Sequence, residues 1–132
     1  MKILLIDDDE WIRDSLKLFF VGEKCDLLAL PTAEDGMKAL SEQRYDIIIC
    51  DYKLPGMDGL AFFEGIQKAY PEVLKVLITA YGNENMVDEA ARIGIHDFIQ
   101  KPLTTNALEK SLAGLVQQYE NRNGEIQPEG NR

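Results

Sequence analysis

The order of short apolar runs and longer amphipathic segments is the feature that most constrains the fold of this 132-residue chain. Short runs rich in apolar residues indicate strands, and apolar residues at helical spacing indicate helices. The predicted strands are residues 3–6, 27–30, 47–50, 74–79 and 97–100, and the predicted helices are residues 10–21, 33–42, 59–70, 85–93 and 105–119. Strands that alternate with helices form parallel sheets covered on both faces, so we predict a single α/β domain.

Individual residues refine the predicted helices. Asp58 stands directly before the third helix, where its carboxylate can accept hydrogen bonds from the first backbone amides as an N-cap. Gly94 follows the fourth helix and is a predicted C-terminal cap. In the second helix we expect Met37 and Leu40 to face the core.

The last residues differ in composition from the rest of the chain. The segment ENRNGEIQPEGNR, from Glu120 onward, is polar throughout. Such a composition is typical of a frayed tail or of the start of a linker. We therefore predict one domain over residues 1–120 and a polar tail over residues 121–132.

Charge and cysteine content exclude several classes of protein. A net charge of −9 argues against direct binding to the nucleic-acid backbone. No apolar run approaches the length of about 20 residues that a membrane span needs, and the first residues do not form a signal peptide. Cys25 and Cys50 have neither metal-ligand nor disulfide-framework spacing, and Cys50 is expected to be a buried free thiol. We expect a soluble cytoplasmic protein.

Polar side chains follow four of the predicted strands. The first strand ends at Asp7, Asp8 and Asp9, the third at Asp51, the fourth at Thr79, and the fifth at Lys101. Ligands of open α/β sheets bind beyond the carboxyl ends of the strands. Acids, a hydroxyl and one ammonium group are therefore expected to meet at one edge of the sheet.

This set of groups suits phosphoryl transfer. Carboxylates that are forced together repel one another unless a proton or a cation joins them. Oxygen ligands without histidine or cysteine favour a hard cation such as Mg²⁺. Lys101 adds a positive charge and Thr79 a hydroxyl donor, so Asp51 is a candidate nucleophile that would form an aspartyl phosphate.

The motifs LLIDDDE, AEDGMKAL, DIIICDYKLPGMDG, VLITAYG and DFIQKPL occur in this order along the chain. In order and spacing they resemble the receiver domain of two-component response regulators over about residues 1–120. The resemblance implies a flavodoxin-like three-layer α/β sandwich with a five-stranded parallel sheet in the order 2-1-3-4-5 and five helices. It also implies a cis peptide bond between Lys101 and Pro102.

The resemblance assigns a role to each matching residue. Asp51 would be the phosphoacceptor. Asp7, Asp8 and Asp51 would hold Mg²⁺ together with the backbone carbonyl of Lys53. The remaining roles are a contact of Thr79 with the phosphoryl group, an ion pair of Lys101 with it, and a switch formed by Thr79 and Phe98.

The resemblance further implies a signalling switch rather than a classical enzyme. A sensor histidine kinase or a histidine phosphotransfer protein would donate its phosphoryl group to Asp51. The face formed by the fourth helix, fifth strand and fifth helix would then change its contacts with an output domain or partner protein, by a shift between two states. Slow self-hydrolysis would reset the switch, and a phosphorylation-dependent homodimer is compatible with the family.

Several residues have a simpler interpretation beside the functional one. We expect Asp9 to start the first helix rather than to bind metal, and His96 to be a surface histidine distant from the acids. Trp11 either covers the edge of the core or contacts the kinase. Lys53 and Tyr81 match positions that tune dephosphorylation in the family, and their bulk suggests slow hydrolysis.

Three other functions fit the sequence less well. A haloacid dehalogenase-type phosphohydrolase would need an acid where Lys53 stands, and also a substrate cap. A flavin-binding module would need a glycine-containing phosphate loop where Asp7 to Asp9 stand. A receiver-like domain that is not phosphorylated usually lacks a key acid, the threonine or the lysine, all of which are present here.

The output of the switch is not readable from the sequence. Too few residues follow residue 120 for a DNA-binding domain. We therefore expect either a single-domain regulator or the receiver part of a longer protein.

Overall fold

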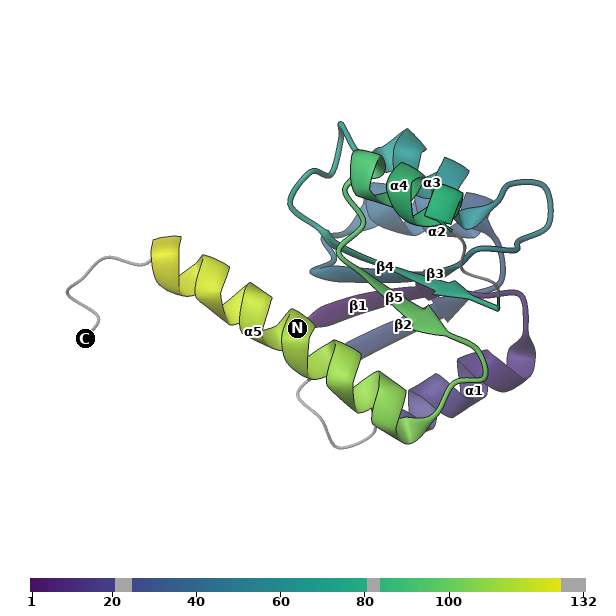
Figure 1. The fold of residues 1–132 in the computed structure, drawn as a ribbon, viewed down its shortest axis with the longest axis horizontal. Coiled ribbons are helices and arrows are strands. Elements are labelled where there is room, and N and C mark those ends of the chain that lie inside the picture. Colours follow the sequence, from purple (N-terminus) through teal and green to yellow (C-terminus); the bar gives the residue numbers. More distant parts are fainter. Residues whose placement is uncertain (21–24, 81–83, 127–132) are drawn as a thin grey trace.

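The structure, a computed structural model, describes residues 1–20, 25–80 and 84–126. Strands and helices alternate along the whole chain (Figure 1). The strands are β1 (Lys2–Ile6), β2 (Asp26–Leu30), β3 (Ile47–Asp51), β4 (Leu74–Thr79) and β5 (Asp97–Gln100), and the helices are α1 (Glu10–Phe19), α2 (Ala33–Glu42), α3 (Gly59–Ile66), α4 (Glu84–Ile93) and α5 (Thr105–Ile126).

The five strands form one parallel sheet in the order β2-β1-β3-β4-β5. This confirms the flavodoxin-like order 2-1-3-4-5. The register places Ile49 of β3 between Leu5 of β1 and Val76 of β4, and Val76 pairs with Asp97 of β5. Because all strands run in the same direction, their carboxyl ends meet at a single edge.

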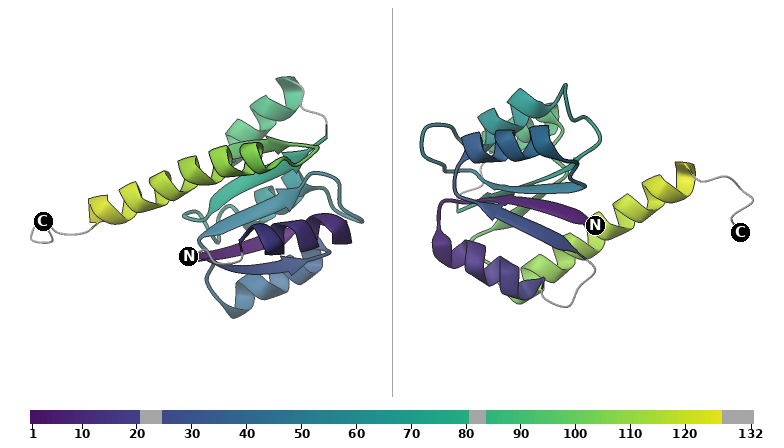
Figure 2. Two further views of the ribbon diagram at one scale, coloured as in Figure 1. Left: turned by 90° about the horizontal axis from the view of Figure 1, so that it is seen from below. Right: turned by 180° about the vertical axis from the view of Figure 1, so that it is seen from behind.

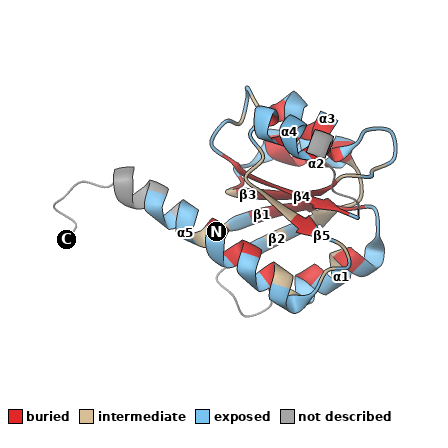
Figure 3. Cartoon of the chain, viewed as in Figure 1, coloured by how far each residue is buried: buried red, intermediate tan, exposed pale blue. Residues whose placement is uncertain are grey.

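Helices cover both faces of the sheet. Figures 1 and 2 show α2, α3 and α4 on one face and α1 and α5 on the other. Successive side chains of a strand point to opposite faces, so Leu4 and Ile48 join the core beneath α2, α3 and α4, whereas Ile3 and Ile47 join the core beneath α1 and α5. The central strands are accordingly buried along their length (Figure 3).

Side chains at the helix ends fix where several helices begin and stop. The carboxylates of Asp9 and Asp58 accept backbone amides as N-caps of α1 and α3, and the Thr32 hydroxyl does the same for α2. Gly94 follows α4 with φ of +91°, a left-handed conformation that suits glycine. These observations confirm the predicted caps at Asp58 and Gly94 and the helix-starting role of Asp9.

Some predicted details were wrong. Met37 is 43% exposed, because the buried stripe of α2 consists of Ala33, Gly36, Ala39 and Leu40 and leaves Met37 beside it.

Helix α3 ends at Ile66 rather than at residue 70, and a turn joins it to β4. Strand β2 begins one residue before the predicted start and α4 one residue before its predicted start. Helix α1 ends at Phe19, while the predicted end at residue 21 lies outside the described residues.

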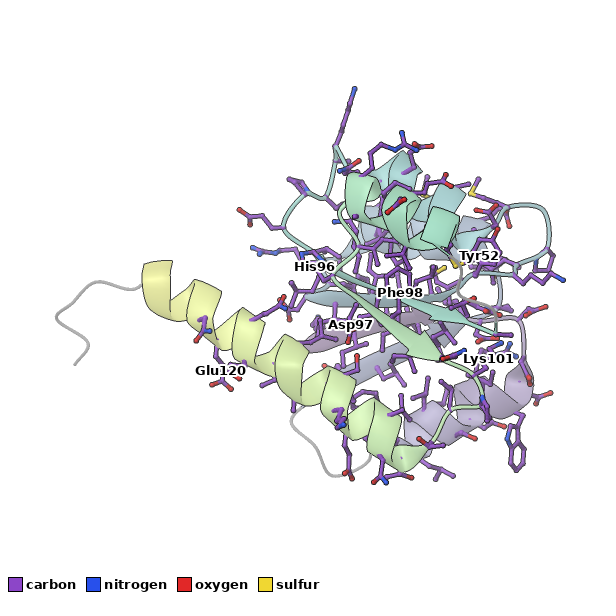
Figure 4. The ribbon with its side chains drawn as sticks, in the orientation of Figure 1. Tyr52, His96, Asp97, Phe98, Lys101 and Glu120 are labelled. Atoms are coloured by element: carbon purple, nitrogen blue, oxygen red, sulfur yellow. The ribbon has the colours of Figure 1, made fainter. Side chains whose placement is uncertain are left out.

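Helix α5 is longer than predicted. It continues to Ile126, although the predicted end was residue 119. Leu115 is the last core residue of α5 among those whose burial is described, and beyond it the helix projects away from the sheet, with Glu120 exposed (Figures 1 and 4). Polar composition does not end a helix, since an exposed helix is polar on its solvent side. Within the described residues no helix has the length and apolar character that a membrane span requires.

Candidate functional site

The carboxyl edge of the sheet gathers the side chains that the sequence predicted to meet there. Asp7 directly follows β1, Asp51 ends β3 and Thr79 ends β4. Lys101 directly follows β5, and its backbone amide donates to the Thr79 carbonyl over 2.9 Å, which aligns the ends of β4 and β5. Figure 4 shows Lys101 at this end of β5. The peptide bond between Lys101 and Pro102 is cis, as the resemblance implied.

Lys101 is the cation between two buried acids. Its Nζ lies 3.2 Å from Oδ2 of Asp51 and 3.9 Å from Oδ2 of Asp7. The Asp7 residue is 0% exposed and Asp51 is 4% exposed. Buried carboxylates are costly unless they are paired. One ammonium group shared by two carboxylates leaves this edge short of positive charge.

Asp7 carries an oxygen that has no hydrogen-bond partner. Its Oδ1 accepts the backbone amide of Asp9 over 2.9 Å. Its Oδ2 is buried and unpaired within the described part of the chain, because Lys101 at 3.9 Å is too distant for a hydrogen bond. Burial, opposed by the Asp9 hydrogen bond and reinforced by the charge of Asp51, raises the pKa of Asp7 to about 6. Within the described residues, the Asp7 carboxylate thus has a cation only in Lys101, which lies closer to Asp51.

Asp51 is better compensated than Asp7. Burial raises the pKa of Asp51, while the hydrogen bond and charge of Lys101 oppose that rise. A backbone hydrogen bond with Lys53 opposes it further. These partners oppose the effect of burial and favour the charged form of Asp51, which is the form that a nucleophile requires.

Three acids offer oxygen atoms to a shared position. Carboxylate oxygens of Asp7, Asp8 and Asp51 all lie within 4.8 Å of one another. The donor set consists of oxygen alone, which suits a hard divalent cation, and the unpaired Oδ2 of Asp7 supplies a ready ligand. The residues therefore fit Mg²⁺, as the sequence predicted, and Asp9 is not part of this group.

The other predicted site residues lie around this group. Thr79 is buried at the end of β4, and the Lys53 side chain is exposed. Phe98 is half-buried on β5, an edge strand of the sheet, and packs against the core beneath α2, α3 and α4 (Figure 4). Tyr81 lies outside the described residues.

Sequence reasoning missed the part that Gly59 has at this edge. A Cβ atom on Gly59 would lie 2.5 Å from the backbone oxygen of Asp51 and 2.9 Å from Cδ1 of Leu77. Its amide donates to the Tyr52 carbonyl over 2.7 Å. Only glycine lets α3 begin so close to the Asp51 backbone, and the signal was the Asp58–Gly59 pair soon after the strand.

Sequence reasoning also missed Arg13. This residue of α1 is six positions beyond Asp7, and its Nη1 donates to the Asp7 backbone carbonyl over 2.9 Å. A charged residue one turn into an amphipathic helix gives no signal that it reaches back to a strand end. The contact depends on the path of the loop between β1 and α1.

The structure also places three residues that the sequence singled out but did not assign to the site, His96, Trp11 and Cys50. His96 was predicted as a surface residue, but it is half-buried: its Nδ1 accepts the Lys75 backbone amide over 3.0 Å. It is nevertheless distant from the acids, at the opposite end of β5 from Lys101 (Figure 4). Trp11 is 77% exposed and does not cover the core. Cys50 is a buried free thiol, as predicted, and burial raises its pKa well above the usual range.

Comparison with known proteins agrees with this geometry. The chain is 33% identical over 107 residues to the response regulator protein FleR of Pseudomonas aeruginosa, covering 81% of this chain and 23% of FleR. It is 28% identical over 131 residues to PilR of the same organism, covering 99% of this chain and 29% of PilR. The chain thus spans about a quarter of the length of these relatives.

A solved structure of the same fold is the CheY-like response regulator receiver domain protein of Methanospirillum hungatei JF-1. It superimposes with a TM-score of 0.85 at 26% identity, over 92% of this chain and 97% of that one. The sequence pattern of the response regulator receiver domain matches residues 3–113. With the acids, the lysine and the strand order in the places described, the chain belongs to the response regulator receiver domain family.

Proposed function

We propose that this receiver domain is a phosphoacceptor switch in which Asp51 takes the phosphoryl group. The observation that carries the proposal is the pairing of Asp51 Oδ2 with Lys101 Nζ at 3.2 Å, beside the unpaired Oδ2 of Asp7. A carboxylate oxygen of Asp51 attacks phosphorus, and the bond between phosphorus and the donor's histidine nitrogen breaks. The donor would be a sensor histidine kinase or a histidine phosphotransfer protein.

The residues at the carboxyl edge of the sheet would have different roles in phosphoryl transfer. Asp7, Asp8 and Asp51, with the Lys53 carbonyl, would hold Mg²⁺, which when bound neutralises charge on the transferring phosphoryl oxygens. Lys101, already beside Asp51, would move to a phosphoryl oxygen as the carboxylate is esterified. Thr79, at the end of the neighbouring strand, would donate its hydroxyl to another phosphoryl oxygen.

The switch would extend from Thr79 along β5. Movement of Thr79 toward the new charge would let Phe98 change its packing, and the face formed by α4, β5 and α5 would change its contacts with an output domain or partner. Slow hydrolysis of the aspartyl phosphate, screened by Lys53 and Tyr81, would return the resting state. Residues 1–120 would form the switch, in a cytoplasmic protein.

Acetyl phosphate tests the phosphoacceptor directly. With Mg²⁺, intact-mass spectrometry should detect one added phosphoryl group on the wild-type protein and none on Asp51→Asn. The matched control is Asp88→Asn, which makes the same chemical change at an exposed position of α4 and should be labelled like the wild type. Labelling that persists in Asp51→Asn would overturn the assignment.

Beryllofluoride, which stands in for the phosphoryl group, tests the switch separately. It should shift backbone amide resonances across residues 79–104 in the presence of Mg²⁺. If binding is detected but this region keeps its spectrum, the phosphoacceptor would remain and the proposed switch would be excluded.

A further inference from the structure

The loop between β1 and α1 is held by contacts that all converge on Asp7. The Asp7 amide donates to the Leu30 carbonyl over 3.0 Å, which continues the pairing of β1 with β2. Its Oδ1 accepts the Asp9 amide over 2.9 Å. Its backbone carbonyl accepts Nη1 of Arg13 over 2.9 Å, in a part-buried contact. Oδ2 is the polar atom of Asp7 that is left for another partner.

Arg13 also fixes the second residue of this arrangement. Its backbone amide donates to the Asp9 carbonyl over 3.1 Å. The Asp9 carboxylate in turn caps α1 by accepting the Trp11 amide over 2.9 Å. Arg13 therefore links the first turn of α1 to Asp9 through its backbone and to Asp7 through its guanidinium group.

We infer that Arg13 is a positioning residue for the magnesium site, acting through the Asp7 backbone rather than by contact with the metal. This inference rests on the proposed function. The guanidinium holds the Asp7 carbonyl, the loop then holds the Asp9 amide against Oδ1, and the orientation of the Asp7 carboxylate toward Asp8 and Asp51 is fixed as a result. Partners beyond the ligands that fix ligand orientation commonly change metal affinity about 10–100-fold.

The sign of the effect separates positioning from simple electrostatics. Arg13 is a cation one helical turn from a group of carboxylates. If only its charge mattered, removing it would strengthen Mg²⁺ binding, because like charges repel. If it positions Asp7, removing it will weaken Mg²⁺ binding despite the more negative site.

The experiment compares Mg²⁺ affinity in four proteins by isothermal titration calorimetry. They are the wild type, Arg13→Met, Arg13→Gln and the control Arg44→Met, which removes the same charge at an exposed residue before the amino end of β3. We expect both Arg13 variants to bind Mg²⁺ about 10-fold more weakly. Arg44→Met should bind like the wild type. Two variants are used so that a folded one is available, as judged by circular dichroism.

A second measurement needs no metal. The Asp9 amide resonance reports its hydrogen bond with Asp7 Oδ1. In metal-free Arg13→Met or Arg13→Gln this resonance should move upfield and its hydrogen exchange should become faster, whereas Arg44→Met should leave it unchanged.

Three outcomes would overturn the inference: unchanged or tighter Mg²⁺ binding in a folded Arg13 variant, an equal loss in Arg44→Met, or an Asp9 amide that does not respond to the Arg13 substitutions. A wild-type protein that binds no Mg²⁺ would instead overturn the magnesium site of the proposed function. The two failures are therefore distinguishable.

Discussion

The two ends of the central sheet bury charged groups in opposite ways. At the amino end, Lys75 is 2% exposed, and its ammonium group donates to the carbonyls of Val73 and Tyr70 over 3.1 and 3.5 Å. The Lys75 backbone amide donates a hydrogen bond to Nδ1 of His96. At the carboxyl end, Asp7 is equally buried, yet its Oδ2 has no hydrogen-bond partner within the described residues.

This difference separates burial that supports the fold from burial that supports a function. A buried charge that is hydrogen-bonded to the backbone joins the chain segments that supply its partners, here two carbonyls of the segment between α3 and β4. A buried carboxylate oxygen without a hydrogen bond, which shares one distant ammonium group with a second acid, raises the free energy of the metal-free site, and a bound cation recovers that free energy. We expect substitutions at the two ends to have effects of opposite sign on the metal-free protein.

Replacing Asp7 should give the largest effect. Asp7→Asn should weaken Mg²⁺ binding at least about 100-fold, or about 2.7 kcal/mol, because a ligand is lost. The metal-free variant should be more stable than the wild type by about 3 kcal/mol at pH 7, since the pKa of Asp7 is raised from 3.8 to about 6. Titration calorimetry and urea unfolding in chelator measure the two quantities. A metal-free variant less stable than the wild type would contradict the comparison.

Replacing Lys75 should destabilise the protein. Lys75→Met keeps the length of the side chain but leaves the carbonyls of Tyr70 and Val73 without their ammonium donor, which should cost about 2–3 kcal/mol. Mg²⁺ affinity should be unchanged, because the site is at the other end of the sheet. Urea unfolding measures the cost, and the exposed substitution Lys110→Met on α5 is the matched control. Equal stabilities of Lys75→Met and wild type would show that this end is not held together by Lys75.

The pH dependence of stability should reveal the strain at the carboxyl end. The pKa of Asp7 is 3.8 unperturbed and about 6 in the folded protein, so the folded state binds more protons between these values. Stability of the metal-free protein should fall by about 2 kcal/mol as pH rises from about 4 to about 6. The raised pKa of Asp51 acts in the same direction. The fall should shrink in Asp7→Asn and with saturating Mg²⁺; an equal fall in Asp7→Asn would assign it to other groups.

The smallest expected effect is at His96. His96→Phe keeps a ring but removes the acceptor of the Lys75 amide, at a cost of about 1 kcal/mol. His96→Asn retains a side-chain oxygen that can accept, and should recover part of that cost. Thermal unfolding at neutral pH measures both variants. If the two variants are equally stable, the hydrogen bond from the Lys75 amide to His96 Nδ1 does not contribute measurably to the stability of the protein.

The sequence was enough to predict the strands and the meeting of the acids. In a parallel sheet the carboxyl ends of all strands lie at the same edge. Residues at or just after the strand ends, which are Asp7, Asp51, Thr79 and Lys101, could therefore be predicted to meet there. The strand order and the cis bond before Pro102 came from the resemblance to receiver domains, and the structure has both.

Contacts between side chains and distant parts of the backbone could not be predicted from the pattern of strands and helices. Arg13 reaches back over six residues to the Asp7 carbonyl, and His96 meets Lys75 only because of the register between β4 and β5. Met37 was placed inward because it is apolar, but small residues form the buried stripe of α2. Apolar periodicity shows which face of a helix is buried, to within about one residue. It therefore does not predict whether a residue at the border of that face is buried or exposed.

The projecting part of α5 extends the reach of the domain beyond its sheet. From Leu115, the last core residue among those whose burial is described, to Ile126 the helix advances about 16 Å at 1.5 Å per residue. Ile126 is about 22 Å from Ser111, where α5 contacts β5, so a tilt of about 10° there would displace Ile126 by about 4 Å. Ser111 on α5 donates to Asp97 at the start of β5 over 2.5 Å, so the pivot is fastened to the strand that carries Phe98. A movement of α5 at its contact with β5 would therefore also move the part of the helix that projects beyond the sheet.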